Sequence, residues 1–368
     1  MRNRVSRDRY APQHGDKHGA AGPSTHGLGD TRIRTAKIAV FGVITLAVVL
    51  LGITVKTFAS EHADSPMVSA ENDRVSQSKE AANQALSTAS FKTRLSKADF
   101  NNIPTGDTVL AFSLADGKAP TLEDDSLTAL WTALDQAQEL GDVGVVFCDL
   151  SSGKGVSYNA DAEVYGASSY KALYALYICE AMAETGQISL DDPLATYGGY
   201  SMGWQTVRNL IEAAVVDSDN DSYIALRAAF DHTGYEEWVT NLDVVDAPLD
   251  PMSDFPTYCA RSSAKLWREM SEYLSLGTEI SQWLSDLLAS TTRSFIRDGI
   301  ADDAVLVRNK GGWISEAGCN ATCDAGLIDV DGRTYVMSIM TSMPWSDHSS
   351  EVVAAIAKAL YDTRAALV

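Results

Sequence analysis

Apolar residues follow two different periods from residue 124 onward. In "DDSLTALWTALDQAQELG", residues 124–141, Leu127, Leu130, Trp131 and Leu134 recur every three or four positions, which predicts a helix with one apolar face. Its acidic start and closing glycine are typical helix ends. The next segment, "VGVVFCDLSSGKGVSYNADAEV", holds two apolar runs around a Ser-Ser-Gly-Lys-Gly turn and predicts a β-hairpin.

A more strongly apolar segment follows in "ASSYKALYALYICEAMAETG", residues 167–186. Its apolar positions, among them Leu173, Leu176 and Met182, spread nearly all round a helix. This distribution is typical of a buried central helix. Gly186 is a residue type that commonly ends helices, so the helix is predicted to stop there.

The rest of the chain completes the fold prediction. "WQTVRNLIEAAVV", "SSAKLWREMSEYLS" and "EISQWLSDLLAST" are helical patterns, and "SEVVAAIAKALYDTRAAL" predicts a closing helix. Between them, "VLVRNKGG" and "AGLIDVDGRTYVMSIMTS" are strand-like, and Asp331-Gly332 is a strong hairpin signal. The sequence therefore predicts an α+β domain, with an antiparallel sheet from both ends of the domain packed against a mostly helical region.

The N-terminal residues have a different character. Residues 1–36 are basic and lack apolar periodicity, which predicts a disordered cytoplasmic tail. Residues 37–58 contain eighteen consecutive uncharged residues, 38–55, which is long enough for one transmembrane helix. Eight Lys and Arg residues precede this span, so the positive-inside rule places the N-terminus in the cytoplasm. Residues 59–123 are predicted to be a polar stalk, and 124–368 an extracytoplasmic domain.

A cleaved signal peptide is the alternative to a retained anchor. Thr57 and Ala59 form a loose small-x-small cleavage site, and cleavage there would give a secreted protein instead of a single-pass membrane protein. The net charge of the whole chain is −20 although its N-terminal tail is basic. This acidic body argues against nucleic acid as a partner.

Five cysteines lie on the predicted exported side, where disulfides persist. Cys148 and Cys179 fall in apolar runs and are expected to be buried as small hydrophobic residues. Cys259, Cys319 and Cys323 are the candidates for one disulfide, whose pairing the sequence leaves open. The "CNATC" string lacks a second pair of ligands, so no metal site is predicted. No cofactor is predicted either.

A serine three residues before a lysine recurs along the chain. Such pairs occur at Ser76, Ser151, Ser168 and Ser262, so the spacing alone carries little information. Ser76 lies in the polar stalk and Ser151 in a hairpin turn, where neither is held or desolvated. Ser262 and Lys265 do open a helix, but a helix cap with a solvated lysine explains them.

Ser168 and Lys171 differ because they open the helix that is predicted to be buried. On a helix, residues three apart share a face, and burial lowers the pKa of a lysine. A partly neutral amine could then take the serine proton. "SDN" at 218–220 and "KGG" at 310–312 follow in the chain.

With these three strings in this order, residues 125–368 resemble the penicillin-recognising serine hydrolases, in particular class A β-lactamases and penicillin-binding proteins. The resemblance implies that Ser168 is the acylated nucleophile, with Lys171 as its proton acceptor or relay. Ser218 would shuttle a proton to the leaving group. Asn220, Lys310 and Gly312 would contact substrate, and the backbone N–H groups of Ser168 and Trp313 would form the oxyanion hole.

Two departures from the family pattern bear on activity. Gly311 has no hydroxyl where the family usually places Thr or Ser, so binding of a substrate carboxylate should weaken. The E-x-x-L-N motif, whose glutamate activates the deacylating water, has no match. The carboxylates available in that region have shorter side chains, and they are Asp243, Asp246, Asp250 and Asp254.

The sequence therefore predicts an extracytoplasmic active-site serine hydrolase, β-lactamase-like or D,D-carboxypeptidase-like, that is acylated by β-lactams or peptidoglycan-type peptides. Because the deacylating glutamate is missing, rapid β-lactam hydrolysis is less expected than acylation. The alternative is a catalytically weak or inactive protein of this fold that binds a cell-envelope partner. The oligomeric state is not predicted.

Overall fold

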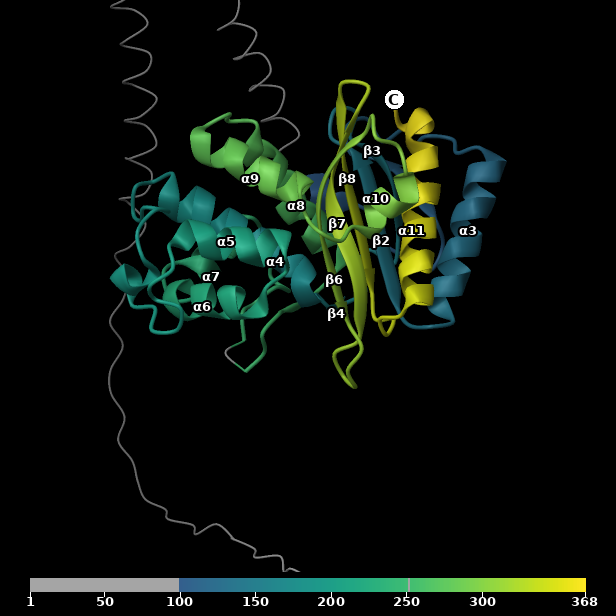
Figure 1. The fold of residues 1–368 in the computed structure, drawn as a ribbon. Coiled ribbons are helices and arrows are strands. Elements are labelled where there is room, and N and C mark those ends of the chain that lie inside the picture. The colour runs from purple at the N-terminus through teal and green to yellow at the C-terminus, as the bar shows by residue number, and fades with distance from the viewer. Residues whose placement is uncertain (1–98, 251) are drawn as a thin grey trace, which may run out of the picture. The chain divides into compact units, whose positions relative to one another are not determined.

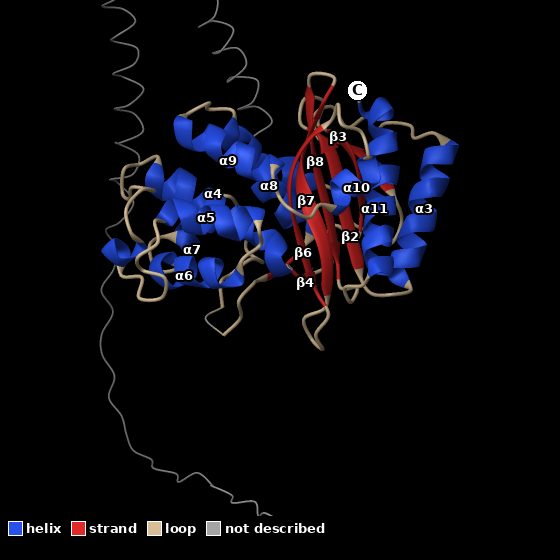
Figure 2. Cartoon of the chain, in the orientation of Figure 1, coloured by secondary structure: helices blue, strands red, loops and turns tan. Residues whose placement is uncertain are grey.

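An antiparallel six-stranded sheet, with the strand order β1-β3-β2-β8-β7-β6, separates two groups of helices. The computed structural model describes residues 99–250 and 252–368. In Figure 1, α4 to α9 lie on one side of the sheet, and α3, α10 and α11 lie on the other. The predicted α+β layout is confirmed, and Figure 2 shows the two helical layers around the strands.

The elements begin and end as follows. The strands are β1 (Leu110–Ser113), β2 (Val143–Asp149), β3 (Lys154–Tyr158), β4 (Val164–Tyr165), β5 (Thr257–Tyr258), β6 (Leu306–Ile314), β7 (Ala321–Val330) and β8 (Arg333–Thr341). The helices are α3 (Asp124–Gln138), α4 (Tyr170–Tyr177), α5 (Val207–Val216), α6 (Asn220–Phe230), α7 (Tyr235–Asn241), α8 (Ala260–Leu274), α9 (Glu279–Ala289), α10 (Phe295–Ile300) and α11 (Asp347–Asp362).

The sheet is buried on both faces because alternate residues of each strand enter different cores. In β2, Val145 and Phe147 pack with α3, α10 and α11. Their neighbours Val146 and Cys148 pack with the helices on the opposite face. Every residue of β2 is buried, which explains why the strand carries no polar side chain from Val143 to Cys148.

Both predicted hairpins are confirmed. Strands β2 and β3 pair antiparallel, and β7 and β8 pair from Val330 and Arg333 outward. Asp331 and Gly332 form the turn between β7 and β8, with φ of 53° and 73°. Two left-handed residues in a two-residue loop match the twist of the paired strands, which is why Asp-Gly predicted this turn correctly.

The sheet begins before the predicted domain boundary at residue 124. Strand β1 pairs with β3 from Leu110 to Ser113, and a short 3₁₀ helix, η1 (Asp99–Asn102), precedes it. The predicted stalk, 59–123, is therefore corrected from residue 99 onward. The strand reads Leu-Ala-Phe-Ser, with no alternation of apolar and polar residues, so the pattern did not reveal β1.

The predicted anchor, residues 37–58, lies outside the described residues, as does the predicted tail. Within residues 99–250 and 252–368, the structure contains no helix that is both long and apolar enough to span a bilayer. The retained anchor and the cleaved signal peptide thus remain predictions.

The predicted disulfide is not present. All five cysteines, each within the described residues, are free thiols. Cys259 caps α8 by accepting from the Ser262 N–H, and the Cys323 thiol in β7 donates to the Thr341 carbonyl at 3.4 Å. Each of these two sulfur atoms therefore forms a hydrogen bond with a residue near it. Cys148 and Cys179 are fully buried, as predicted.

Arg261 of α8 binds the segment that precedes β1. Arg261 donates to the carbonyls of Phe100, Asn101 and Ile103, and its guanidinium also binds both oxygens of Asp161. The segment that leads into β1 is thereby fixed to the side of the sheet that α4 to α9 cover.

We expect Arg261→Ala to lower the free energy of unfolding by about 2 to 3 kcal/mol, because hydrogen bonds from a charged donor are lost together. The matched control is Lys358→Ala, which removes an exposed ion pair with Asp362 and should cost less than about 0.5 kcal/mol. Chemical denaturation of both variants and of the wild type measures these changes in the free energy of unfolding. Equal effects would show that Arg261 contributes no more than a surface charge.

Candidate active site

Ser168 lies where a 3₁₀ turn, η2 (Ala167–Ser169), runs into α4. Its side chain is partly exposed, whereas both flanking residues are buried. Ala167 has a φ of 45°, a left-handed conformation that costs an alanine free energy. The backbone before Ser168 is therefore held in an unfavourable conformation by its surroundings, which fixes where the hydroxyl projects.

Lys171 lies one turn further along and is 1% exposed. Its Nζ donates to the carbonyl of Ser218 at 2.5 Å and to Oδ1 of Asn220 at 2.6 Å. Within the described chain, no hydrogen bond joins Lys171 to Ser168. When the amine is neutral, its two N–H bonds can serve these two carbonyl oxygens, which leaves its lone pair available for a proton.

Ser218 stands in the short connection between α5 and α6. Its φ is 61°, again left-handed, and Asp219 caps α6 by accepting from the Ser222 N–H at 2.7 Å. Asn220 is then the first residue of α6. The strained turn and the cap together aim Ser218 and Asn220 at Lys171.

Lys310 approaches the same serine from β6. It is also 1% exposed, and its Nζ donates to Ser218 Oγ at 3.0 Å and to the Gly311 carbonyl at 3.1 Å. The Nζ of Lys171 is 3.5 Å from Ser218 Oγ. Two lysines from different elements therefore share one hydroxyl.

This arrangement lowers the pKa of both amines. Burial, followed by the nearby charge of Lys310, lowers the pKa of Lys171 to about 7. Burial lowers the pKa of Lys310 to about 8, against the opposing effect of Asp324. Near neutral pH, Lys171 is therefore partly neutral and can accept a proton, while Lys310 remains mostly charged.

Gly312 brings β6 against the turn that carries Ser168. A Cβ at Gly312 would lie 2.4 Å from the Ser169 N, 2.8 Å from the Gly166 carbonyl oxygen and 2.9 Å from the Ser168 N. Only glycine permits this approach. Trp313 follows directly, so the two backbone N–H groups predicted to form the oxyanion hole come from adjacent segments.

Gly311 has different surroundings. A Cβ there would meet its nearest atoms at 3.5 to 3.7 Å, which is ordinary contact. The hydroxyl that the family pattern places here is therefore missing from a position with room for a side chain.

Asp324 is a functional candidate that the sequence reasoning missed. It is fully buried in β7, opposite Gly311, and burial raises its pKa to about 6. Asn309 Nδ2 and the Ile296 N–H donate to its two oxygens at 2.6 and 3.0 Å. Its negative charge favours protonated Lys310. The sequence signal was a carboxylate among the small and apolar residues in the middle of the strand.

The four aspartates considered as activators of the deacylating water differ in their contacts. Asp243 pairs with Lys265, Asp246 binds Ser262, and Asp250 caps its own turn. Asp254 differs, since its charge raises the pKa of Lys171. Its neighbour Phe255 places its ring 5.6 Å from the Lys171 Nζ.

Arg227 of α6 holds the loop that carries Asp254. Its guanidinium donates to the backbone carbonyls of Ser253 and Asp254, each at 2.7 Å, and pairs with Asp231 at 2.8 Å. This loop is thereby tied to the same helix that supplies Asn220.

The competing serine–lysine pairs have structural roles. The predicted cap with a solvated lysine is wrong, because Cys259 is the cap of α8 and Lys265 is buried. Ser262 is buried and donates to Asp246, and Lys265 donates to the Asp243 carbonyl at 2.6 Å. Lys154, the partner of Ser151, donates to the C-terminal residue Val368. Ser76 lies outside the described residues.

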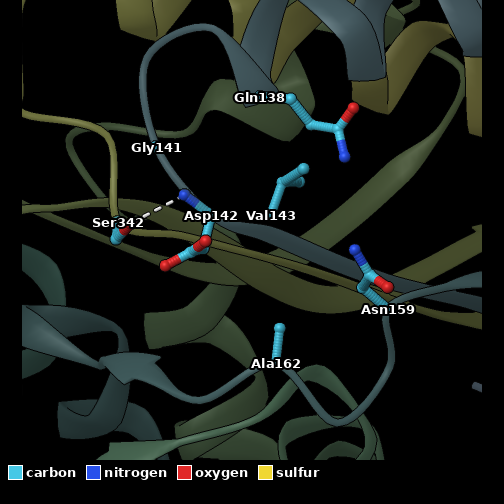
Figure 3. A pocket seen from close by; sticks show the side chains of 7 residues that line it. All are labelled: Gln138, Gly141, Asp142, Val143, Asn159, Ala162 and Ser342. Atoms are coloured by element: carbon cyan, nitrogen blue, oxygen red, sulfur yellow. Dashed lines mark hydrogen bonds between the residues drawn. The ribbon is translucent and has the colours of Figure 1, made fainter. Parts of the chain in front are cut away.

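A separate pocket of about 310 Å³ lies where β2 begins and β3 and β8 end. Figure 3 shows its lining residues, Gln138, Gly141, Asp142, Val143, Asn159, Ala162 and Ser342. None of them belongs to the serine–lysine cluster, by which we mean Ser168, Lys171, Ser218, Asn220 and Lys310. The described part of the chain also holds no group of His, Cys, Asp and Glu residues arranged to bind a metal.

The comparisons agree with this geometry. A sequence model of the "Beta-lactamase enzyme family" matches residues 126–364, which is more than half of the chain, whereas no curated protein matches it. A β-lactamase from Chitinophaga pinensis has a TM-score of 0.55 at 18% identity, over 64% of this chain and 99% of that one.

Two further solved structures have the same fold. A class A β-lactamase from Mycobacterium abscessus has a TM-score of 0.54 at 20% identity, over 65% of this chain and 100% of that one. A protein described as PBP-A has a TM-score of 0.54 at 18% identity, over 65% of this chain and 96% of that one. Given the family match over residues 126–364, this chain belongs to the β-lactamase enzyme family.

Proposed function

We propose that this protein is an active-site serine hydrolase whose Ser168 is acylated by β-lactams or by cell-wall peptide amides. One observation carries the proposal: Lys171, one helical turn from Ser168, is buried and has a pKa lowered to about 7. Lysines are rarely buried unless they are paired. Lys265 is buried and pairs with Asp243, whereas none of the ion pairs among the described residues includes Lys171. Here the fold stabilises a partly neutral amine beside a serine.

Acylation would proceed in two steps, attack on the amide carbonyl and departure of the amide nitrogen. Ser168 Oγ attacks the carbonyl carbon of the amide, and its proton passes to the neutral Lys171 Nζ. The oxyanion is stabilised by the backbone N–H groups of Ser168 and Trp313, a kind of contact typically worth about 3 to 4 kcal/mol per donor. The C–N bond then breaks, and the leaving nitrogen takes a proton through Ser218.

The hydrogen bonds of Ser218 support its place in this relay. Its Oγ lies between the two lysine amines, so it can give a proton to the leaving nitrogen and regain one from a lysine. Lys310 keeps most of its charge at pH 7 and would attract a substrate carboxylate.

We propose that the acyl-enzyme is long-lived. Hydrolysis of the ester requires an activated water, and the family's glutamate has no counterpart in this sequence. Asp254 is the best placed of the available carboxylates, but its side chain is exposed and shorter than that of a glutamate. Acylation is therefore expected to be faster than hydrolysis of the acyl-enzyme.

The proposed cellular setting follows from the predicted anchor and from the substrates. A domain held outside the cytoplasmic membrane by residues 37–58 would meet both β-lactams and cell-wall peptides. The competing function, a non-catalytic protein that binds a cell-envelope partner, gains support only from the missing Gly311 hydroxyl and the missing glutamate.

The test is covalent labelling of the full chain with benzylpenicillin, followed by intact mass. We expect a mass increase of one penicillin per chain that is absent in Ser168→Ala. The adduct should persist for many minutes after excess reagent is removed, because water is poorly activated. Ser262→Ala is the matched control and should label as the wild type does.

Labelling that survives in Ser168→Ala would refute the assigned nucleophile. Sustained turnover of a chromogenic cephalosporin would refute the slow release. A chain that forms no adduct with penicillin or with a D-Ala-D-Ala peptide would favour the non-catalytic alternative.

Gly312 and Gly311 provide an internal comparison on one strand. We expect Gly312→Ala to slow acylation by about a hundredfold or more, because displacing the Ser168 amide should cost at least about the 2.7 kcal/mol of a lost oxyanion donor. Gly311→Ala should change the rate less than about threefold, because its Cβ meets only ordinary contacts. Thermal melts would confirm that both variants are folded, and similar rates would contradict the close packing of β6 on Ser168.

A further inference from the structure

A pocket of about 310 Å³ lies outside the serine–lysine cluster, at the end of the sheet where β2 begins. Helix α3 ends beside it at Gln138. The chain that leaves β3 contributes Asn159 and Ala162, and the chain that leaves β8 contributes Ser342. Three segments that are distant in sequence therefore enclose a volume that a small ligand group can fill.

The side chains that line this pocket offer hydrogen-bond acceptors. The amide groups of Gln138 and Asn159 both bond to the Tyr158 hydroxyl, and Figure 3 shows them pointing toward one another. The Asp142 N–H donates to Ser342 Oγ at 2.8 Å. None of the hydrogen bonds within the described chain ends on either amide oxygen or on the Asp142 carboxylate. A ligand in the pocket must therefore supply donors.

The charge around the pocket is negative. Burial raises the pKa of Tyr158, and the charges of Asp107 and Asp135 raise it further. Asp142 adds a third carboxylate, and no Lys, Arg or His is among the residues that line the pocket. Helix α3 also directs the negative end of its dipole here, and its last turn carries no basic residue. A cation is therefore the charge type that this pocket favours.

Other aspartates at the ends of β2 and β3 have basic partners. Asp161, in the connection between β3 and β4, pairs with Arg261 at 2.6 Å. Asp149, at the far end of β2, pairs with Arg333. Asp142 belongs to none of the ion pairs among residues 99–250 and 252–368. The carboxylate that lines the pocket is thus the one whose charge is left without a cation.

The pocket lies at the same end of the sheet as the predicted oxyanion donor Trp313. Val143, which lines the pocket, pairs with Thr341. Thr341 Oγ1 donates to the Thr322 carbonyl at 2.8 Å, and Thr322 pairs with Trp313. Three strand spacings separate the two places, which is about 14 Å. An extended peptide of about four residues spans this distance.

We propose that this pocket binds a primary ammonium group, either of a free amine or of an extended peptide that reaches it from Ser168. An ammonium has three N–H donors. They match the Asp142 carboxylate and the amide oxygens of Gln138 and Asn159, and the surrounding carboxylates attract its charge. Binding of a free amine requires no acylation of Ser168, so this inference is testable independently of the proposed function.

The test is calorimetric titration of the full chain carrying Ser168→Ala, in which acylation contributes no heat. Cadaverine is the probe for a free amine. Ala-Ala-Ala-D-Ala-D-Ala with a free N-terminus is the probe for a peptide, set against its N-acetylated form. We expect saturable binding of at least one ammonium probe, and the probe that binds identifies the source. The uncharged 1,5-pentanediol and the acetylated peptide should bind at least about tenfold more weakly than their ammonium counterparts.

Variants of the lining residues test where the ammonium binds. Asp142→Asn should weaken binding at least about tenfold, because a charge-assisted hydrogen bond is lost. Asn159→Gly removes one amide oxygen and should weaken binding about threefold, since glycine suits the φ of 40° at this position. Asp303→Asn, which removes an exposed carboxylate between α10 and β6, is the matched control and should leave the affinity unchanged. Thermal melts establish that each variant is folded.

Three results would overturn the inference while leaving the proposed function intact. They are no binding of either ammonium probe, equal binding of cadaverine and pentanediol, and an affinity that Asp142→Asn changes no more than Asp303→Asn does. A wild-type chain that forms no penicillin adduct on Ser168 would overturn the proposed function, but it would not alter the expected binding of cadaverine.

Discussion

Two buried lysines that share one serine hydroxyl are the constraint on which the candidate site depends. Lys171 and Lys310 arrive from a helix and a strand, and both lie within hydrogen-bonding distance of Ser218 Oγ. Burial lowers the pKa of both amines, and the nearby charge of Lys310 lowers that of Lys171 further. The same cost of burying a charge makes Lys171 a usable base near neutral pH.

Several local features maintain this unfavourable arrangement. Ala167 and Ser218 both adopt left-handed backbone conformations, and Gly312 lets β6 press against the Ser168 turn. Asp324, buried on the neighbouring strand β7, offsets part of the cost by favouring the charged form of Lys310. The sheet and the helical layer thus each supply one lysine, and the packing between them keeps the two lysines close.

The sequence predicted the features that depend on local pattern. The hairpin turn at Asp331 and Gly332 and the buried helix after Ser168 follow from turn chemistry and apolar spacing, and both are present. What it missed depends on contacts between distant segments. Strand β1 does not alternate apolar and polar residues, and Asp324 gains its significance only from neighbours far away in the chain. The predicted disulfide failed for the same reason, because cysteine spacing does not reveal which side chains meet.

The most direct test of this account is the pKa of Lys171 itself, measured by NMR titration of the full chain with isotope-labelled lysine. The Lys171 signal can be assigned by its loss in Lys171→Met. The account predicts that the amine loses its proton near pH 7, so that it is charged at pH 6 and neutral at pH 8. A lysine that remains charged up to about pH 10, the ordinary range for this side chain, would contradict the claim that the fold prepares Lys171 to take the proton of Ser168.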